Sequence, residues 1–348
     1  MSFIEKYSTE SELYYKTETG VRCLACNFNC NISEGRSGNC GMRFNKNGKL
    51  FVPDGYVSAL NIDPIEKKPV YHFMPGSMTL SFSTFGCNFK CNYCQNWELS
   101  QLIKIDELSE LQLIKISPSS IYDIVKKRGI KIIVSTYNEP VISIEFAKKI
   151  FKNAKEKDNS IKTGFVSNGY ISQDGFNYIR DYIDFIRIDL KSFNKDRFRK
   201  LTGADLNLLL KSIEMVYEAG KHIELVTLVV TDFNDSLAEI KQMINFIKSL
   251  SSDIPWHLTK FHPDYRMTET PETDEKKIEA FIETAKDLGL KYVYGGNYNT
   301  ANSSTLCPKC SSLLIRRGYM SIIENKIKAM DGKGFCPKCG YEVYGVFY

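Results

Sequence analysis

The chain has 348 residues, of which 43% are hydrophobic and 25% charged, proportions that are typical of a folded globular protein and exclude extensive disorder. Its 46 basic and 41 acidic residues are interspersed and leave a formal net charge of +5, which is too small to predict nucleic-acid binding. The amino terminus lacks a basic segment followed by an apolar run, and no stretch approaches the roughly 20 apolar residues of a membrane span. We therefore expect a cytoplasmic protein that makes no contact with a membrane.

The first region, residues 1–78, is rich in cysteine, glycine and asparagine and has weak periodicity. Disulfides are rare in the reducing cytosol, so its closely spaced cysteines predict a metal site that holds a small fold together. Either zinc or a second 4Fe-4S cluster suits four thiolates, and we favour zinc because compact intracellular four-cysteine sites commonly hold it. The predicted ligands are Cys23, Cys26, Cys30 and Cys40.

The middle region, residues 79–300, alternates short apolar runs with longer segments of helical period, which predicts βα units on a parallel sheet. A helix should follow Asp235, with Ile240, Met243, Ile244 and Ile247 on its buried face, and another should begin at Ser117-Pro118. We count six units, whose strands are 80–85, 131–135, 163–167, 185–190, 223–230 and 256–261.

Cys87, Cys91 and Cys94 follow the first predicted strand, on a loop where a barrel of parallel strands places its chemistry. Three close thiolates suit a 4Fe-4S cluster and leave one iron without a protein ligand. A small molecule with an amine and a carboxylate could chelate that iron, and the methionine end of S-adenosyl-L-methionine has both groups. The alternative is a structural zinc knuckle that takes its fourth ligand from elsewhere in the chain.

The three-cysteine motif, with Tyr93 before its last cysteine, resembles the cofactor motif of the radical S-adenosylmethionine (radical SAM) superfamily. The resemblance implies an α/β fold with a partial (β/α)6 TIM-like barrel. It also implies an oxidoreductase-type enzyme whose reduced cluster cleaves S-adenosylmethionine to methionine and a 5'-deoxyadenosyl radical, which abstracts hydrogen from a substrate. An electron donor such as ferredoxin or flavodoxin would then be a partner, and no catalytic residue is assigned beyond the cluster.

Four later stretches match the cofactor-binding pattern of that superfamily, each at the end of a predicted strand. Thr136–Pro140 stands where the family often has Gly-Gly-Glu-Pro, so Glu139 would accept hydrogen bonds from the cofactor's ammonium, with Asn138 beside it. Ser167 and Asn168 resemble a stretch of the enzymes that activate glycyl radical enzymes. Val166 replaces an aspartate that helps to hold a monovalent cation there, so such a cation is not expected.

Alternation along a strand places Asp189 and Lys191 on one face, where they would contact the cofactor or instead form a structural ion pair. His262 falls where activating enzymes have a ribose-contacting histidine, although a lone histidine often has a purely structural role. All these residues, together with Tyr93, would line one cofactor site.

The resemblance extends over nearly the whole chain, to the family of AmmeMemoRadiSam-system radical SAM enzymes, which is related to pyruvate formate-lyase activating enzyme. It includes CNYCQNW, TYNEP, IDLKSF and FHPDYRM, although Asn27-Phe28 replaces a common Pro-His. No substrate follows from the resemblance. One alternative is an activating enzyme that makes a glycyl radical on a partner protein, and another is a non-catalytic protein stapled by zinc.

The last region, residues 301–348, contains two matching knuckles with a Cys-Pro-Lys-Cys sequence. This pattern predicts a tetrahedral four-thiolate site, either a zinc ribbon or a rubredoxin-like single iron, because ligand spacing does not separate the two metals. The predicted ligands are Cys307, Cys310, Cys336 and Cys339.

Overall fold

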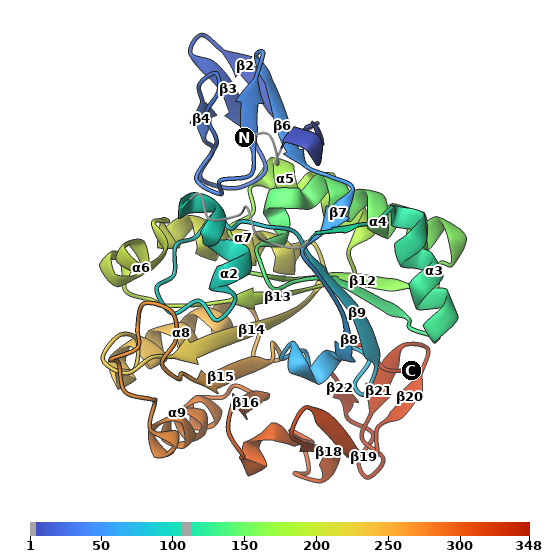
Figure 1. Ribbon diagram of the computed structural model, residues 1–348. Coiled ribbons are helices and arrows are strands. Elements are labelled where there is room, and N and C mark those ends of the chain that lie inside the picture. Colours follow the sequence, from blue (N-terminus) through green and yellow to red (C-terminus); the bar gives the residue numbers. More distant parts are fainter. Residues whose placement is uncertain (1–4, 106–112) are drawn as a thin grey trace.

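The computed structural model describes residues 5–105 and 113–348; residues 1–4, at the start of the predicted amino-terminal region, lie outside the described residues. Its centre is a sheet of eight strands in the order β16-β15-β14-β13-β12-β11-β9-β8 (Figure 1). The strands from β9 to β16 are parallel, and β8 pairs antiparallel with β9. Their bounds are β8 Ala59–Pro64, β9 Met78–Ser83, β11 Ile132–Ser135, β12 Lys162–Ser167, β13 Phe185–Asp189, β14 His222–Val229, β15 Trp256–Lys260 and β16 Val293–Gly296.

The predicted α/β class is confirmed, and the six predicted strands match β9 and β11–β15 to within about two residues at each end. Burial explains the success, since every residue of β11 is buried, as expected for a parallel strand covered on both faces. The prediction missed β16, a short strand that contains two glycines. It also missed β8, whose first four residues are exposed or half-exposed and which comes from the predicted amino-terminal region.

Helices connect the parallel strands and lie around the outside of the curved sheet (Figure 1). As predicted, α3 begins at Pro118 with Ser117 as its N-cap, and the four expected apolar residues of α8 are buried. The helix bounds are α2 Trp97–Ser100, α3 Pro118–Arg128, α4 Ile144–Lys157, α5 Gln173–Ile179, α6 Lys195–Thr202, α7 Leu206–Glu218, α8 Leu237–Leu250 and α9 Glu275–Asp287. Within the described ranges, no helix has the length and apolar character needed to cross a membrane.

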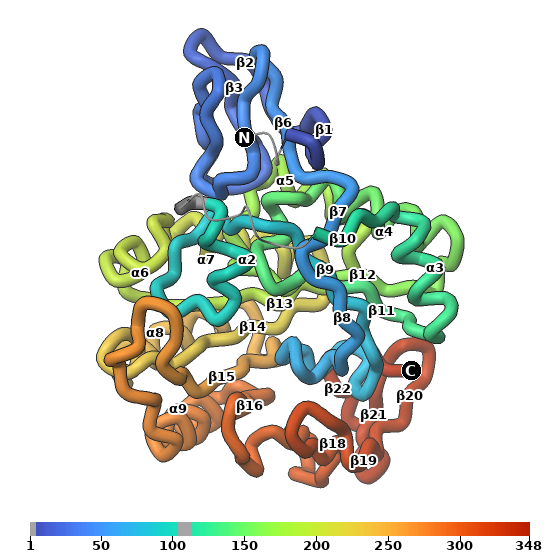
Figure 2. The backbone as a smooth tube through the Cα atoms, viewed as in Figure 1, coloured from blue at the N-terminus to red at the C-terminus, as the bar shows by residue number. Residues whose placement is uncertain are grey.

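The amino-terminal segment forms two small sheets that stand at one end of the central sheet (Figure 2). A buried ion pair fixes it there: Arg43 donates two hydrogen bonds to Glu145 of α4, at 2.7 and 2.8 Å, and Ser11 donates a third to the same carboxylate. The strands are β1 Ser8–Glu10, β5 Phe44–Lys46 and β6 Lys49–Pro53 in one sheet, and β2 Tyr14–Thr17, β3 Gly20–Cys23 and β4 Asn31–Ile32 in the other. Nearby, β7 Tyr56–Val57 pairs with β10 Ile114–Lys115.

The carboxy-terminal segment packs at the opposite end, against β14–β16 (Figure 2). Its anchor is the buried carboxylate of Glu224, which accepts hydrogen bonds from the backbone of His72 and from the ring of His257. The His72 ring in turn contacts the Tyr344 carbonyl and the Tyr294 hydroxyl, both at 2.6 Å. The strands are β17 Thr305–Leu306, β18 Leu313–Gly318 and β19 Ser321–Asn325, then β20 Lys328–Met330, β21 Lys333–Phe335 and β22 Glu342–Val343.

Candidate active site

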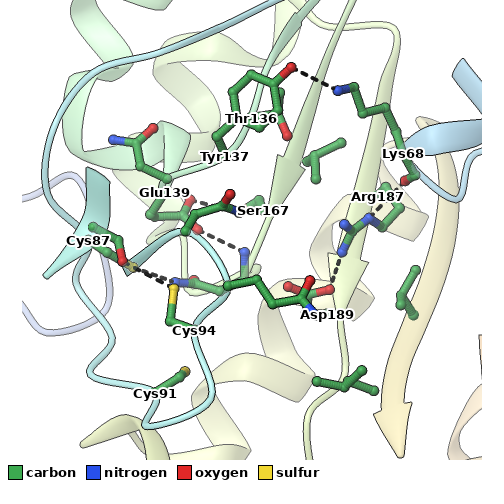
Figure 3. Close-up of a pocket in the computed structure, with 18 of the residues that line it drawn as sticks. Lys68, Cys87, Cys91, Cys94, Thr136, Tyr137, Glu139, Ser167, Arg187 and Asp189 are labelled. Atoms are coloured by element: carbon green, nitrogen blue, oxygen red, sulfur yellow. Dashed lines mark hydrogen bonds and ion pairs between the residues drawn. The ribbon is translucent and has the colours of Figure 1, made fainter. Parts of the chain in front are cut away.

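Three cysteines on the loop after β9 face one cavity of about 400 Å³. Cys91 is buried, Cys87 and Cys94 are partly buried, and the Cys94 sulfur lies 3.1 Å from the Ser100 hydroxyl. Figure 3 shows them on one side of this cavity. One metal ion requires its sulfur ligands to lie close together. In the part of the chain that the structure describes, these three sulfurs do not all lie within 4.8 Å of one another. Three thiols that share a cavity at wider spacing fit a polynuclear cluster with one vertex left free of protein.

Glu139 lies beside these thiols, on the loop that follows β11. Its buried carboxylate accepts hydrogen bonds from the Ser167 hydroxyl and the Asn168 backbone amide, both at 2.7 Å, and from the Val141 amide at 3.1 Å. Burial raises the pKa of Glu139 to about 7 in spite of these hydrogen bonds. The carboxylate is thus positioned to favour a cationic ligand.

Asn138 and Asn168 connect this carboxylate to the cysteine loop. The Asn138 side chain donates to the Gly86 carbonyl at 3.0 Å, and the Asn168 side chain donates to Oδ1 of Asn88 at 2.7 Å. The predicted pair Ser167 and Asn168 therefore holds Glu139 on one side and the cysteine loop on the other. Val166 also lines the cavity, and no acidic group stands at its position.

Tyr137, immediately before Asn138, has a φ of 70°, which is unusual for a residue with a side chain. Strained backbone of this kind gathers at ligand sites. The Tyr137 hydroxyl donates to Asp63 at 2.9 Å, and the ammonium of Lys68 lies 2.9 Å from the same carboxylate. The sequence gives no signal for this contact, because Asp63 and Lys68 come from the segment around β8, which was not predicted to join the sheet.

Asp189 lies between two cations at the end of β13. Lys191 Nζ is 3.0 Å from Asp189 Oδ2, and Arg187 forms an ion pair with Oδ1. Burial would raise the pKa of Asp189, but Arg187 and Lys191 outweigh it and hold that pKa below its usual value. The ion pair between Asp189 and Lys191, which the sequence offered as an alternative to cofactor binding, is thus present. All three side chains also line the cavity. Sequence reasoning missed Arg187, although the alternation that relates Asp189 to Lys191 extends to it.

The remaining two predicted contacts differ in position. Tyr93 is buried at the cavity wall, with Lys191 Nζ 5.7 Å from its ring centroid. His262 is exposed and is not among the residues that line the cavity in the described chain, and its Nε2 lies 2.7 Å from the Gln95 side chain, which does line it. The structure therefore brings together every predicted cofactor contact except His262.

The carboxy-terminal cysteines form the compact group that their spacing predicts. The sulfur atoms of Cys307 and Cys339 are 3.5 Å apart, those of Cys310 and Cys336 are 3.7 Å apart, and all four lie within 4.8 Å of one another. Four thiolates around one tetrahedral metal ion have this spacing.

The amino-terminal cysteines Cys23, Cys26, Cys30 and Cys40 line a second, separate cavity. Burial raises the pKa of Cys30 to about 11 and also raises those of Cys26 and Cys40. Any metal bound here must therefore displace protons from the thiols.

A family model described as the radical SAM superfamily matches residues 81–247, from β9 to α8. This segment contains the three cysteines of the first cavity together with Glu139, Asp189 and Lys191. The chain belongs to the radical SAM superfamily. It is therefore a radical SAM enzyme, for which a 4Fe-4S cluster and S-adenosylmethionine are implied, and its substrate is not identified.

The chain is similar to several known proteins. Uncharacterized protein MJ0808 of Methanocaldococcus jannaschii is 34% identical over 339 residues, which cover 96% of this chain and 98% of its own. The 4-hydroxyphenylacetate decarboxylase activating enzyme of Clostridium scatologenes is 28% identical over 51% of this chain and 54% of its own. Among solved structures, Streptococcus suis SuiB bound to S-adenosylmethionine has a TM-score of 0.49 and 15% identity, covering 67% of this chain and 53% of its own.

Proposed function

We propose that the cavity binds S-adenosylmethionine between the three-cysteine loop and β13 and makes this chain an oxidoreductase-type enzyme of the AmmeMemoRadiSam-system family. The proposal rests on one observation. Cys87, Cys91 and Cys94 line the same cavity as a buried carboxylate and a lysine. When bound, the cluster supplies the electron that cleaves the cofactor to methionine and a 5'-deoxyadenosyl radical, which abstracts hydrogen from the substrate.

In this proposal, different residues of the cavity bind different groups of the cofactor. Glu139 accepts hydrogen bonds from the ammonium, and Lys191 pairs with the carboxylate of the methionine end. Asp189, held by Arg187, orients Lys191 and accepts a hydrogen bond from the ribose. His262, outside the cavity lining, would reach the ribose only if its contact with Gln95 were exchanged for one with the ligand.

The test is anaerobic reconstitution with iron and sulfide, reduction with dithionite, and measurement of 5'-deoxyadenosine after addition of S-adenosylmethionine. The intact chain should form it, and Cys91→Ala should reduce it to background. Lys90→Ala is the matched control, because Lys90 is exposed between two cysteines of the motif and should leave product formation intact. Absence of product from the intact, reduced chain would contradict the proposal.

A narrower proposal makes a partner protein the substrate, as in enzymes that generate glycyl radicals. The similarity to enzymes with activating-enzyme names supports it, including the putative glycyl-radical enzyme activating enzyme MJ1632, which is 25% identical over 62% of this chain. Electron paramagnetic resonance would show a glycyl radical doublet on the partner after turnover. Absence of this doublet with every candidate partner would contradict the narrower proposal and favour a small-molecule substrate.

Two further assignments belong to the same proposal. A ferredoxin or flavodoxin would reduce the catalytic cluster, and zinc would occupy the compact site of Cys307, Cys310, Cys336 and Cys339. Metal analysis of that site separates zinc from a single iron. The non-catalytic alternative is not favoured, because inert binding would not require thiols, carboxylates and lysine around one cavity.

A further inference from the structure

The two four-cysteine sets of this chain differ in how far apart their sulfurs lie. A zinc–thiolate bond is about 2.3 Å long, so four thiolates around one tetrahedral zinc lie about 3.8 Å apart. The carboxy-terminal set meets this requirement, with sulfur pairs at 3.5 and 3.7 Å. That set provides an internal reference for a site that fits one metal ion.

The amino-terminal set does not meet the same requirement. The structure describes all four of its cysteines. Among these described residues, no three sulfur atoms lie within 4.8 Å of one another, whereas the four carboxy-terminal sulfurs do. The four nevertheless line one small cavity, so they surround a common space. Four thiolates that bind four different irons of a cubane are spaced more widely than four thiolates that share one ion. The spacing therefore fits a polynuclear cluster better than zinc.

The walls of this cavity suit a cluster that is shielded from water. Ala25, Ile32, Val141 and Ile142 line it together with the cysteines. A methyl group on Gly38 would come within 3.4 Å of the Cys30 sulfur and 3.2 Å of Ile32, so a larger residue would press on the ligand. The backbone amide of Arg43 lies 3.4 Å from the Cys40 sulfur and donates to it, which is a contact that stabilises a thiolate.

The cavity is in direct contact with the loop that carries the catalytic cysteines. Gly86, next to Cys87, has a φ of +87°, and a methyl group there would lie 2.7 Å from the Cys40 carbonyl oxygen. The Met42 side chain would lie 2.5 Å from the same methyl group, so the two cysteine loops pack closely at a position that only glycine fits.

Asn88 provides a second contact between the two cavities. It is 4% exposed, follows Cys87 directly, and lines the amino-terminal cavity. Its Oδ1 accepts the hydrogen bond from Asn168, which lines the catalytic cavity, and its side chain also contacts the thiol of Cys26, one of the amino-terminal ligands. Asn88 thus connects a ligand of the amino-terminal cavity to a residue of the catalytic cavity, and its amide is placed to donate to the sulfur of a cluster ligand.

We propose that Cys23, Cys26, Cys30 and Cys40 bind a second iron–sulfur cluster, which passes one electron past Asn88 to the catalytic cluster. The second cluster is oxidised by one electron as the catalytic cluster is reduced by one, and a low-potential flavin or iron–sulfur carrier protein then reduces the second cluster again. No covalent bond of the protein changes. This inference rests on the proposed function only for the identity of the electron acceptor.

The metal content of two multiple variants tests the site in the reconstituted full-length chain. The Cys87→Ala/Cys91→Ala/Cys94→Ala variant should keep about four iron atoms with matching sulfide, and the Cys26→Ala/Cys30→Ala variant should lose about four relative to the intact chain. After reduction, the first variant should give a cluster signal in electron paramagnetic resonance that S-adenosylmethionine does not alter. Additional zinc and no iron–sulfur signal in that variant would overturn the inference, even if the intact chain forms 5'-deoxyadenosine.

To test the electron path, 5'-deoxyadenosine is measured once with a flavodoxin as the reductant and once with dithionite. Dithionite is a small molecule that reduces exposed clusters directly, so the ratio of the two yields reports on the path. Asn88→Leu, which leaves all eleven cysteines in place, should lower this ratio at least about tenfold, and Lys90→Leu should not. An unchanged ratio in Asn88→Leu would refute the path. If neither reductant gives product with the intact chain, the proposed function fails, whereas the metal content still decides whether the second cluster exists.

Discussion

The buried carboxylate of Glu139 predicts that S-adenosylmethionine binds more tightly as the pH rises toward neutrality. Its pKa of about 7 in the free protein means that it is largely protonated at pH 6. A cationic ligand stabilises the ionised form and lowers that pKa, so below pH 7 binding must release a proton. Asp189 should contribute nothing to this effect, because Arg187 and Lys191 already keep it ionised.

The expected size of the effect follows from this pKa. Between pH 7.5 and pH 6 the ionised fraction of a group with a pKa of 7 falls roughly eightfold, and each full unit of pH below the pKa corresponds to about 1.4 kcal/mol of binding free energy. The dissociation constant should rise by the same factor. Proton release should approach one per bound ligand at pH 6.

Calorimetry under anaerobic conditions, in buffers of different ionisation enthalpy, measures the affinity and the proton release together. Glu139→Gln should make the affinity less dependent on pH and lower the proton release by about one per ligand at pH 6, and a thermal unfolding scan shows whether the variant is folded. Glu156→Gln, at an exposed site on α4, should keep both. An affinity of the intact chain that is independent of pH from 6 to 7.5 would refute the reasoning.

Three further predictions concern the modules at the two ends of the chain. Arg43→Met leaves the buried Glu145 carboxylate unpaired and should lower the free energy of unfolding by about 3–5 kcal/mol in urea titration. Lys49→Met, at an exposed ion pair, should leave the free energy of unfolding nearly unchanged. Cys336→Ser should release one metal ion per chain and lower the unfolding temperature, which metal analysis and calorimetry check. Burial lowers the pKa of His72 to about 3, so stability should fall as the pH drops below the unfolded value of about 6.5, by up to about 1.4 kcal/mol per unit, and the fall should be shallower in His72→Gln.

The parts of the site that follow strands were predictable from the sequence for a physical reason. The carboxyl ends of parallel strands meet at one edge of the sheet, so residues after β9, β11, β12 and β13 converge whatever the intervening helices contain. Glu139 and Lys191 could thus be placed in one site from their positions alone. Arg187 was missed because it lies inside β13, although it stands in the same alternating row.

Other features depend on contacts that local sequence does not encode. The pairing of β8 with β9 brings Asp63 and Lys68 to Tyr137, and the short alternation of Leu60 to Asp63 does not indicate which sheet this strand joins. His262 was expected in the site because it follows β15, but it lies in an exposed loop where its ring contacts the Gln95 side chain and the Pro263 carbonyl. The wide spacing of the amino-terminal sulfurs is likewise a tertiary property, since the intervals between cysteines permit either metal.

The carboxy-terminal module also reaches the catalytic cavity. Met320, in the turn between β18 and β19, is one of the residues that line the cavity, although it is distant in sequence from the family-matched segment. On β18, Arg317 donates a hydrogen bond to the Tyr71 carbonyl at 2.8 Å and so ties this hairpin to the segment between β8 and β9. Since a metal-stapled module loses its fold when the metal is removed, loss of that metal should free the hairpin and open one wall of the cavity. By this reasoning, a metal at the four-thiolate site would act on the catalytic cavity through the fold of the module and not by direct contact.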